Sequence, residues 1–150
     1  MLTLHKGSLF SIEAHGYVNT VNCSGVVGSR GVFMGFKRRF PEMITAYQRL
    51  CNAGELQPGQ IWTWYSPTGI AVLNLAIKEH WRGSSQYQWV QKCLTSLKLA
   101  LTGMRGKKVV MPALGCDRDG LRWNQVHDMI FSTLGDVNDV DIIVLEPDHV

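Results

Sequence analysis

Two glycine-rich segments contain most of the residues in this 150-residue sequence whose types and spacing suit ligand chemistry. Residues 22–31 read Asn-Cys-Ser-Gly-Val-Val-Gly-Ser-Arg-Gly, and residues 112–121 read Pro-Ala-Leu-Gly-Cys-Asp-Arg-Asp-Gly-Leu. Glycines let a backbone approach a ligand closely, and the N–H groups at the start of a following helix bind phosphate. Neither segment matches the P-loop or the GxGxxG pattern. One such segment is as consistent with a tight turn as with a ligand site, but two in matching positions favour a diphosphate site.

Lys37 and two aspartates are the candidates for reacting groups. If residues 32–40 are helical, three phenylalanines form one stripe and Lys37 lies on its margin. Desolvation beside aromatic rings would make the lysine amine nucleophilic, whereas the alternative is that the amine reaches out to water. Asp117 and Asp119 lie in the second glycine-rich segment, where each would either face a ligand as a general base or bond its own backbone.

Residues 78–82, Lys-Glu-His-Trp-Arg, lie between a predicted strand and a predicted helix. An exposed tryptophan flanked by cations can stack on a base or sugar while the cations reach a phosphate. The alternative is that Trp81 covers the core and the charges are only solvated.

Short β-type runs alternate with helical patterns, which predicts a layered α/β fold with a largely parallel or mixed sheet. The strands are expected at residues 2–5, 17–21, 61–65, 70–75, 108–111 and 140–145. Residues 66–69, Ser-Pro-Thr-Gly, predict a hairpin between the third and fourth strands.

Three helices have apolar stripes at helical spacing. The first follows Pro41, the second is capped by Ser84 or Ser85 and stops at Gly103, and the third covers residues 123–134. Their inward residues are expected to be Met43, Ile44, Tyr47 and Leu50; Tyr87, Val90, Leu94, Leu97 and Leu101; and Val126, Met129, Ile130 and Leu134.

The composition is that of a globular chain, because 45% of residues are hydrophobic and 18% are charged. The length predicts one domain over residues 1–150, and no apolar run is long enough to span a bilayer. The four cysteines form no CxxC pair, so reduced thiols are expected and no metal site or cofactor is indicated. These features predict a cytoplasmic protein with no membrane partner.

The net charge of +3 is too small to indicate nucleic-acid binding by itself, but the charge is unevenly distributed. Residues 1–108 hold 13 basic and 4 acidic side chains, and residues 109–150 hold 2 and 8. The positive excess would favour an anionic substrate, with most of the acids expected on a solvated far side.

The chain resembles a macrodomain, the ADP-ribose-binding α/β/α module, over nearly its full length. The likeness is carried by the order and spacing of residues 19–22, 25–31, 36–37, 40–41, 78–82, 112–116 and 145–147. Within that family it is most similar to the DNA ADP-ribosyl glycohydrolase branch and shares features with the terminal ADP-ribose protein glycohydrolase. The resemblance implies a three-layer macrodomain over residues 1–150 with a central mixed, mostly parallel sheet.

The resemblance also implies residue roles. Residues 7–9 would border adenine, Asn22 would hold the distal ribose, Lys37 would attack the anomeric carbon and Asp119 would assist proton transfer. The expected ligand-binding residues are Ser8, Leu9, Asn22, Gly25, Val26, Gly28, Ser29, Arg30, Gly31, Val32, His80, Trp81, Arg82, Pro112, Leu114, Gly115, Cys116, Asp117, Arg118 and Gly120.

The sequence has one residue more than the family pattern between Gly28 and Lys37. Because one residue turns a helix by about 100°, an extra residue inside the helix would redirect Lys37.

The implied function is an ADP-ribosyl hydrolase that removes ADP-ribose from a nucleobase such as thymidine in DNA, or from an acidic side chain. Its partners would be ADP-ribose or an ADP-ribosylated substrate, including ADP-ribosylated single-stranded DNA, and it would act as a monomer. Two alternatives stay open: a non-catalytic ADP-ribose reader or sponge, and a phosphatase for ADP-ribose 1″-phosphate.

Overall fold

Six strands form one mixed sheet in the order β1-β6-β5-β2-β4-β3. The computed structural model describes residues 1–29, 31–116 and 120–148. The strands are β1 (Leu2–His5), β2 (Gly16–Asn22), β3 (Ile61–Tyr65), β4 (Ala71–Lys78), β5 (Lys108–Met111) and β6 (Asp141–Leu145). Every neighbouring pair is parallel except β3 and β4, which form the predicted antiparallel hairpin.

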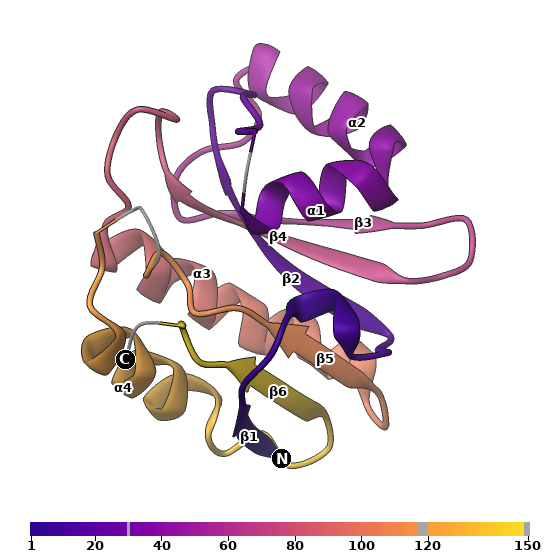
Figure 1. Cartoon of the computed structure of the whole chain (residues 1–150), viewed down its shortest axis with the longest axis vertical. Helices are drawn as coiled ribbons and strands as arrows, with labels where there is room; N and C mark the ends of the chain where they lie inside the picture. Colours follow the sequence, from indigo (N-terminus) through magenta and orange to yellow (C-terminus); the bar gives the residue numbers. More distant parts are fainter. Residues whose placement is uncertain (30, 117–119, 149–150) are drawn as a thin grey trace.

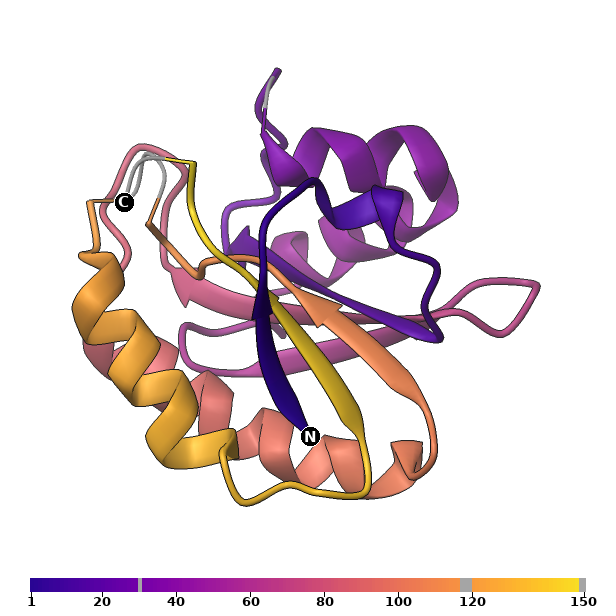
Figure 2. The same cartoon turned by 60° about the horizontal axis from the view of Figure 1, so that its bottom comes forward.

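Helices cover both faces of this sheet (Figures 1 and 2). The pair α1 (Val32–Arg39) and α2 (Pro41–Asn52) lies on one face, and α3 (Tyr87–Ala100) and α4 (Trp123–Leu134) lie on the other. The predicted three-layer α/β/α fold is therefore confirmed. Within the described residues, no helix has the length and apolar character needed to cross a membrane.

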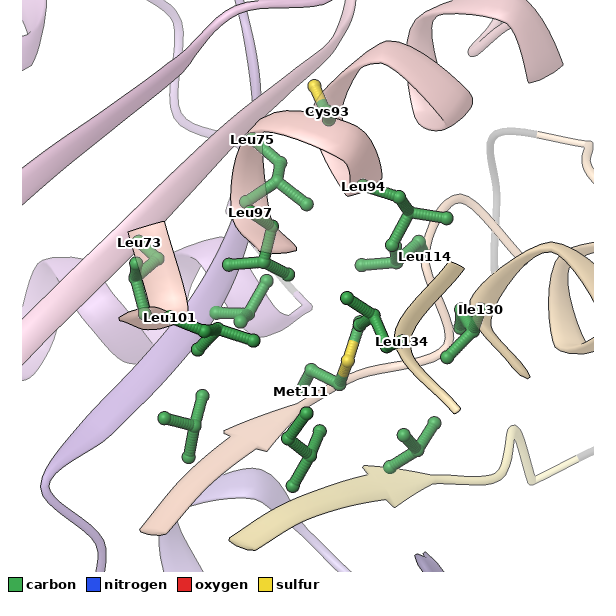
Figure 3. Close-up of a cluster of buried hydrophobic side chains, with 14 of the residues drawn as sticks. Leu73, Leu75, Cys93, Leu94, Leu97, Leu101, Met111, Leu114, Ile130 and Leu134 are labelled. Atoms are coloured by element: carbon green, nitrogen blue, oxygen red, sulfur yellow. The ribbon is translucent and has the colours of Figure 1, made fainter. Parts of the chain in front are cut away.

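The core follows from the period-two alternation of β4. Leu73, Leu75 and Ile77 point to the α3 and α4 side, whereas Val72 and Ala76 belong to clusters on the other face. Figure 3 shows the first side, where the β4 leucines meet side chains from α3, β5 and α4. Because both faces of β4 are covered, its sequence is apolar at nearly every position.

The predicted ends of the α3 helix are wrong. Gln86, rather than Ser84 or Ser85, occupies the N-cap position and makes no side-chain cap bond. The Ser85 hydroxyl is instead buried and has no hydrogen-bond partner among the described residues. At the other end the α-helix stops at Ala100, and Gly103 lies inside a short 3-10 helix that follows it.

The carboxyl ends of the parallel strands all lie on the same side of the sheet. β2 ends at Asn22, β4 at Lys78 and β5 at Met111, so the segments that follow these strands meet on that side. Crevices outside the carboxyl ends of parallel strands are the usual ligand sites of α/β sheets.

Candidate functional site

A cavity of about 510 Å³ opens at the carboxyl ends of β2, β4 and β5. We call it the main cavity. It is lined by Thr20, Val21, Asn22, Val26, Gly28, Ser29, Gly31, Val32, Phe33, Ile77, Lys78, Trp81, Arg82, Gly83, Pro112, Ala113 and Gly115. Both glycine-rich segments and the loop after β4 therefore contribute to one space.

A second cavity of about 330 Å³, the side cavity, adjoins the main one. The two share Gly31, Val32, Pro112 and Ala113, so they form one continuous groove. The rest of the side cavity is lined by Gly7, Ser8, Leu9, Phe10, Gly35, Leu145, Glu146, Pro147 and Asp148. The groove therefore has two compartments joined where the start of α1 faces the segment after β5.

Asn22 organises the first half of the glycine-rich segment. Its Oδ1 accepts hydrogen bonds from the Ser24 N–H at 3.0 Å, the Ser24 hydroxyl at 2.9 Å and the Gly25 N–H at 3.1 Å. Its Nδ2 donates to the Val26 carbonyl at 2.8 Å. Because these backbone donors turn inward to Asn22, a ligand anion must find its donors further along the segment.

Those donors lie at the start of α1. Gly31 has a φ of +90°, which favours glycine, and no side chain of the described residues caps the helix. The first N–H groups of a helix have no partner inside it, and they carry the positive end of the helix dipole. Since Gly31, Val32 and Phe33 line the main cavity, this helix start is suited to bind an anion between the two compartments.

The segment after β5 forms the opposite wall. Gly115 has a φ of +70°, and the Leu121 N–H closes the turn by donating to the Gly115 carbonyl at 3.1 Å. Pro112, Ala113 and Gly115 line the main cavity. Leu114 points the other way, is 0% exposed and packs in the core.

The loop after β4 is fastened to the first glycine-rich segment. The Trp81 N–H donates to the Ser24 hydroxyl at 3.2 Å, and the Cys23 N–H donates to the Glu79 carbonyl at 3.1 Å. The Lys78 Nζ donates to the Trp81 carbonyl at 3.2 Å. Two cations, Lys78 and Arg82, therefore line the main cavity.

Trp81 lines this cavity and is partly exposed to solvent. Its side chain is 42% exposed, and the Arg82 guanidinium lies 4.7 Å from the indole centroid. His80 stacks on it with ring centroids 6.0 Å apart. Such an aromatic and cationic surface suits stacking against a planar group.

The structure does not bring Lys37 to the groove. Lys37 is exposed near the end of α1 and lines neither cavity. The helix begins at Val32, so Ser29 and Gly31 lie before it. The aromatic stripe was correctly expected to be buried at Phe36, but the lysine follows the alternative of reaching out to water.

Twelve of the expected ligand-binding residues line the groove: Ser8, Leu9, Asn22, Val26, Gly28, Ser29, Gly31, Val32, Trp81, Arg82, Pro112 and Gly115. Five described ones do not: Gly25, His80, Leu114, Cys116 and Gly120. Arg30, Asp117, Arg118 and Asp119 lie outside the described residues.

Three charged residues that line the groove were not among the expected ligand-binding residues: Lys78 in the main cavity, and Glu146 and Asp148 in the side cavity. For Lys78, the signal that could have identified it is that the apolar run of the predicted strand at 70–75 continues through Ala76 and Ile77, which places Lys78 at the carboxyl end of β4.

The Cys23 thiol of the first glycine-rich segment is not activated. Burial raises the pKa of Cys23 to about 12, and Cys51 and Glu79 add to the rise. Cys23 is therefore protonated at neutral pH and unsuited to nucleophilic attack. Within residues 1–29, 31–116 and 120–148, no cluster of His, Cys, Asp or Glu suits a metal ion.

Several known proteins are similar to this chain in sequence and in fold. "DNA ADP-ribosyl glycohydrolase" of Mycobacterium tuberculosis is 33% identical over 150 residues, covering 98% of this chain but only 42% of the relative. The solved macrodomain of M. tuberculosis DarG matches with a TM-score of 0.92 at 32% identity, over 99% of each chain. That of Thermus aquaticus DarG matches with a TM-score of 0.89 at 33% identity, over 98% of this chain and 99% of that one.

The chain thus spans about two fifths of the length of the curated relatives that it matches. The Macro domain family model matches residues 18–130, which include most of β2, the start of α1 and the segment after β5. The three-layer fold, the groove at the carboxyl edge and these matches agree, and the chain belongs to the macro domain family.

Proposed function

We propose that this chain binds ADP-ribose in the two-compartment groove and hydrolyses the bond between ADP-ribose and a modified nucleobase or acidic side chain. The observation that carries the proposal is the helix start at Gly31 and Val32, which joins two compartments and offers N–H donors between them. A diphosphate linking two nucleoside-sized groups fits that arrangement. The name of the curated relatives, DNA ADP-ribosyl glycohydrolase, supports the same activity.

The groove suggests an orientation for the ligand. The side cavity offers the apolar side chains of Leu9 and Phe10, which suit a base such as adenine. The main cavity is lined by Lys78 and the partly exposed Trp81, which suit the distal ribose and the group attached to it. The reacting bond would then lie in the main cavity.

Cavity geometry favours Lys78 over Lys37 as the nucleophile. In this mechanism the Lys78 amine attacks the anomeric carbon of the distal ribose, and the bond to the base or carboxylate breaks. The attacking nitrogen gives up a proton, the leaving group takes up a proton, and water then cleaves the lysine adduct to release ADP-ribose and the free amine. Asp119 stays the predicted proton-transfer residue.

The test compares two lysine variants on the same substrates. Lys78→Ala is expected to lower release of ADP-ribose from a thymidine-modified oligonucleotide by about 100-fold or more, while ADP-ribose affinity changes only a few-fold. Lys37→Ala is the matched control and is expected to retain wild-type turnover. If Lys37→Ala loses turnover and Lys78→Ala keeps it, Lys37 rather than Lys78 is the nucleophile.

The same assay separates the alternatives. The panel adds a glutamate-modified protein and ADP-ribose 1″-phosphate. Binding of ADP-ribose with no turnover on any substrate would favour the reader, and phosphate release from the 1″-phosphate would favour the phosphatase.

For the attached group, we infer that a single DNA strand leaves the main cavity over Trp81. The exposed indole offers a stacking surface, and Arg82 supplies a cation beside it. That the chain acts as a monomer stays a prediction.

A further inference from the structure

Tyr47 lies on α2, behind the first glycine-rich segment, and is 1% exposed. Its hydroxyl donates to the Asn22 carbonyl at 2.6 Å and to the Asn22 Oδ1 at 2.8 Å. One hydroxyl therefore holds both the backbone and the side chain of Asn22. Asn22 in turn holds Ser24 and Gly25 through its Oδ1.

The Tyr47 ring has a second route to the groove. It packs edge to face on Phe33 with centroids 5.2 Å apart at 71°. Phe33 lies in the first turn of α1 and lines the main cavity, whereas Tyr47 lines neither cavity. Tyr47 thus contacts both the residue that organises the segment and the helix start that follows it.

The phenol is suited to act as a permanent donor. Burial raises the pKa of Tyr47 well above its usual range, which favours the protonated O–H form. A buried network of this kind is rigid when all its members are satisfied.

We propose that Tyr47 is a positioning residue that holds the first glycine-rich segment in its ligand-binding shape through Asn22. The identity of the ligand rests on the proposed ADP-ribose function. The role of Tyr47 in holding the segment does not depend on that function. Asn22 therefore organises the segment in addition to lining the main cavity.

The experiment uses Tyr47→Phe, which keeps the ring on Phe33 and removes only the hydroxyl. Amide hydrogen exchange of Ser24 and Gly25 is expected to accelerate by about three- to tenfold, because the net value of one hydrogen bond corresponds to that factor. Exchange in β4 is expected to stay unchanged. The dissociation constant for ADP-ribose is expected to rise by a similar factor, while that for AMP, which would reach only the side cavity and the helix start, changes less than twofold.

Tyr17→Phe is the matched control. Tyr17 is also buried, and its hydroxyl donates to the Ile12 carbonyl at 2.7 Å, away from the segment. Its loss is expected to leave exchange at Ser24 and Gly25, and the ratio of the ADP-ribose and AMP constants, at wild-type values.

The outcomes are distinguishable. Unchanged exchange at Ser24 and Gly25 in Tyr47→Phe would overturn the inference whatever the ligand is. A parallel loss of ADP-ribose and AMP binding would also overturn it, since it would mean general destabilisation. Failure of the wild-type protein to bind ADP-ribose would overturn the proposed function, and the exchange measurement would still decide the role of Tyr47.

Discussion

Cys93 is a thiol buried between α3 and the sheet, and its Sγ lies 3.6 Å from the Ala76 carbonyl and 3.5 Å from the Gln60 carbonyl (Figure 3). Burial raises the pKa of Cys93 from 9.0 to about 12. The thiol therefore ionises at a lower pH in the unfolded chain than in the folded one. Its contribution to the free energy of unfolding is fully present below pH 9. That contribution is lost as the pH rises towards 12.

The free energy of unfolding of the wild type, relative to Cys93→Ala, is therefore expected to decrease above pH 9. The decrease approaches about 1.4 kcal/mol per pH unit, the value for one proton. Urea unfolding of both proteins at pH 7.5, 9 and 10.5 with a reductant measures it. Other groups that titrate in this range cancel in the difference, and a difference that stays constant with pH would contradict the raised pKa.

The sequence predicted which segments form the site better than it predicted where their side chains point. The glycine-rich segments were identified from composition, yet Asn22 turns its oxygen into the segment and Leu114 turns into the core. Lys37 and Lys78 are both lysines near apolar residues, and only their placement on a helix or at a strand end separates them. Direction depends on contacts between distant segments, which a single sequence does not contain.

At the scale of elements, the turn between β5 and α4 depends on Gly115. A Cβ added there would lie 2.7 Å from the Leu121 Cδ1, and the φ of +70° is itself unfavourable for other residues. Leu121 is buried, so its side chain has little room to move.

Gly115→Ala is therefore expected to destabilise the fold by about 2–4 kcal/mol, of which about 1–2 is backbone strain. Its wall of the main cavity should also shift, weakening ADP-ribose binding. Gly69→Ala in the hairpin turn is the control, because its φ is +87° and an added Cβ meets nothing within 4 Å. Thermal unfolding and ADP-ribose titration of both variants check this, and equal losses of stability would exclude the Leu121 contact as a cause.

The strands were predictable because their alternation and turn residues are local signals. β1, β3 and β5 match the expected bounds, and so does α4. The ends of α3 were not predictable, because burial of Ser85 removes it from capping and the chain continues as a 3-10 helix after Ala100. Helix ends are decided by tertiary contacts that compete with capping preference.

At the scale of the whole molecule, part of the charge asymmetry is neutralised away from the groove. Lys98 pairs with Asp136 at 2.9 Å, and Arg105 pairs with Asp139 at 3.0 Å. These exposed pairs join the basic first 108 residues to the acidic remainder, so Asp136 and Asp139 are solvated and paired at the same time. Lys78 and Arg82 are cations of the basic stretch that line the groove.

This distribution predicts a modest salt dependence for a DNA substrate. Affinity for an ADP-ribosylated single-stranded oligonucleotide is expected to fall with salt, with a slope of about 0.7 on logarithmic axes for each phosphate contacted. Arg82→Ala is expected to reduce the slope by about one such contact. Lys98→Ala, on the far side, is expected to leave it unchanged. Titrations between low and moderate salt measure both, and a slope that is equal in all three proteins would mean that Arg82 contacts no phosphate.

The place of β6 in the sheet has a consequence for the order of assembly during synthesis. β6 lies between β1 and β5, and it pairs Leu2 with Ile142, residues that are 140 positions apart. The strand made last must therefore enter between two strands made earlier, and until it does, β1 has no neighbour. The side cavity needs Gly7 to Phe10 from one end of the chain and Leu145 to Pro147 from the other. The groove is consequently complete only after β6 has joined the sheet.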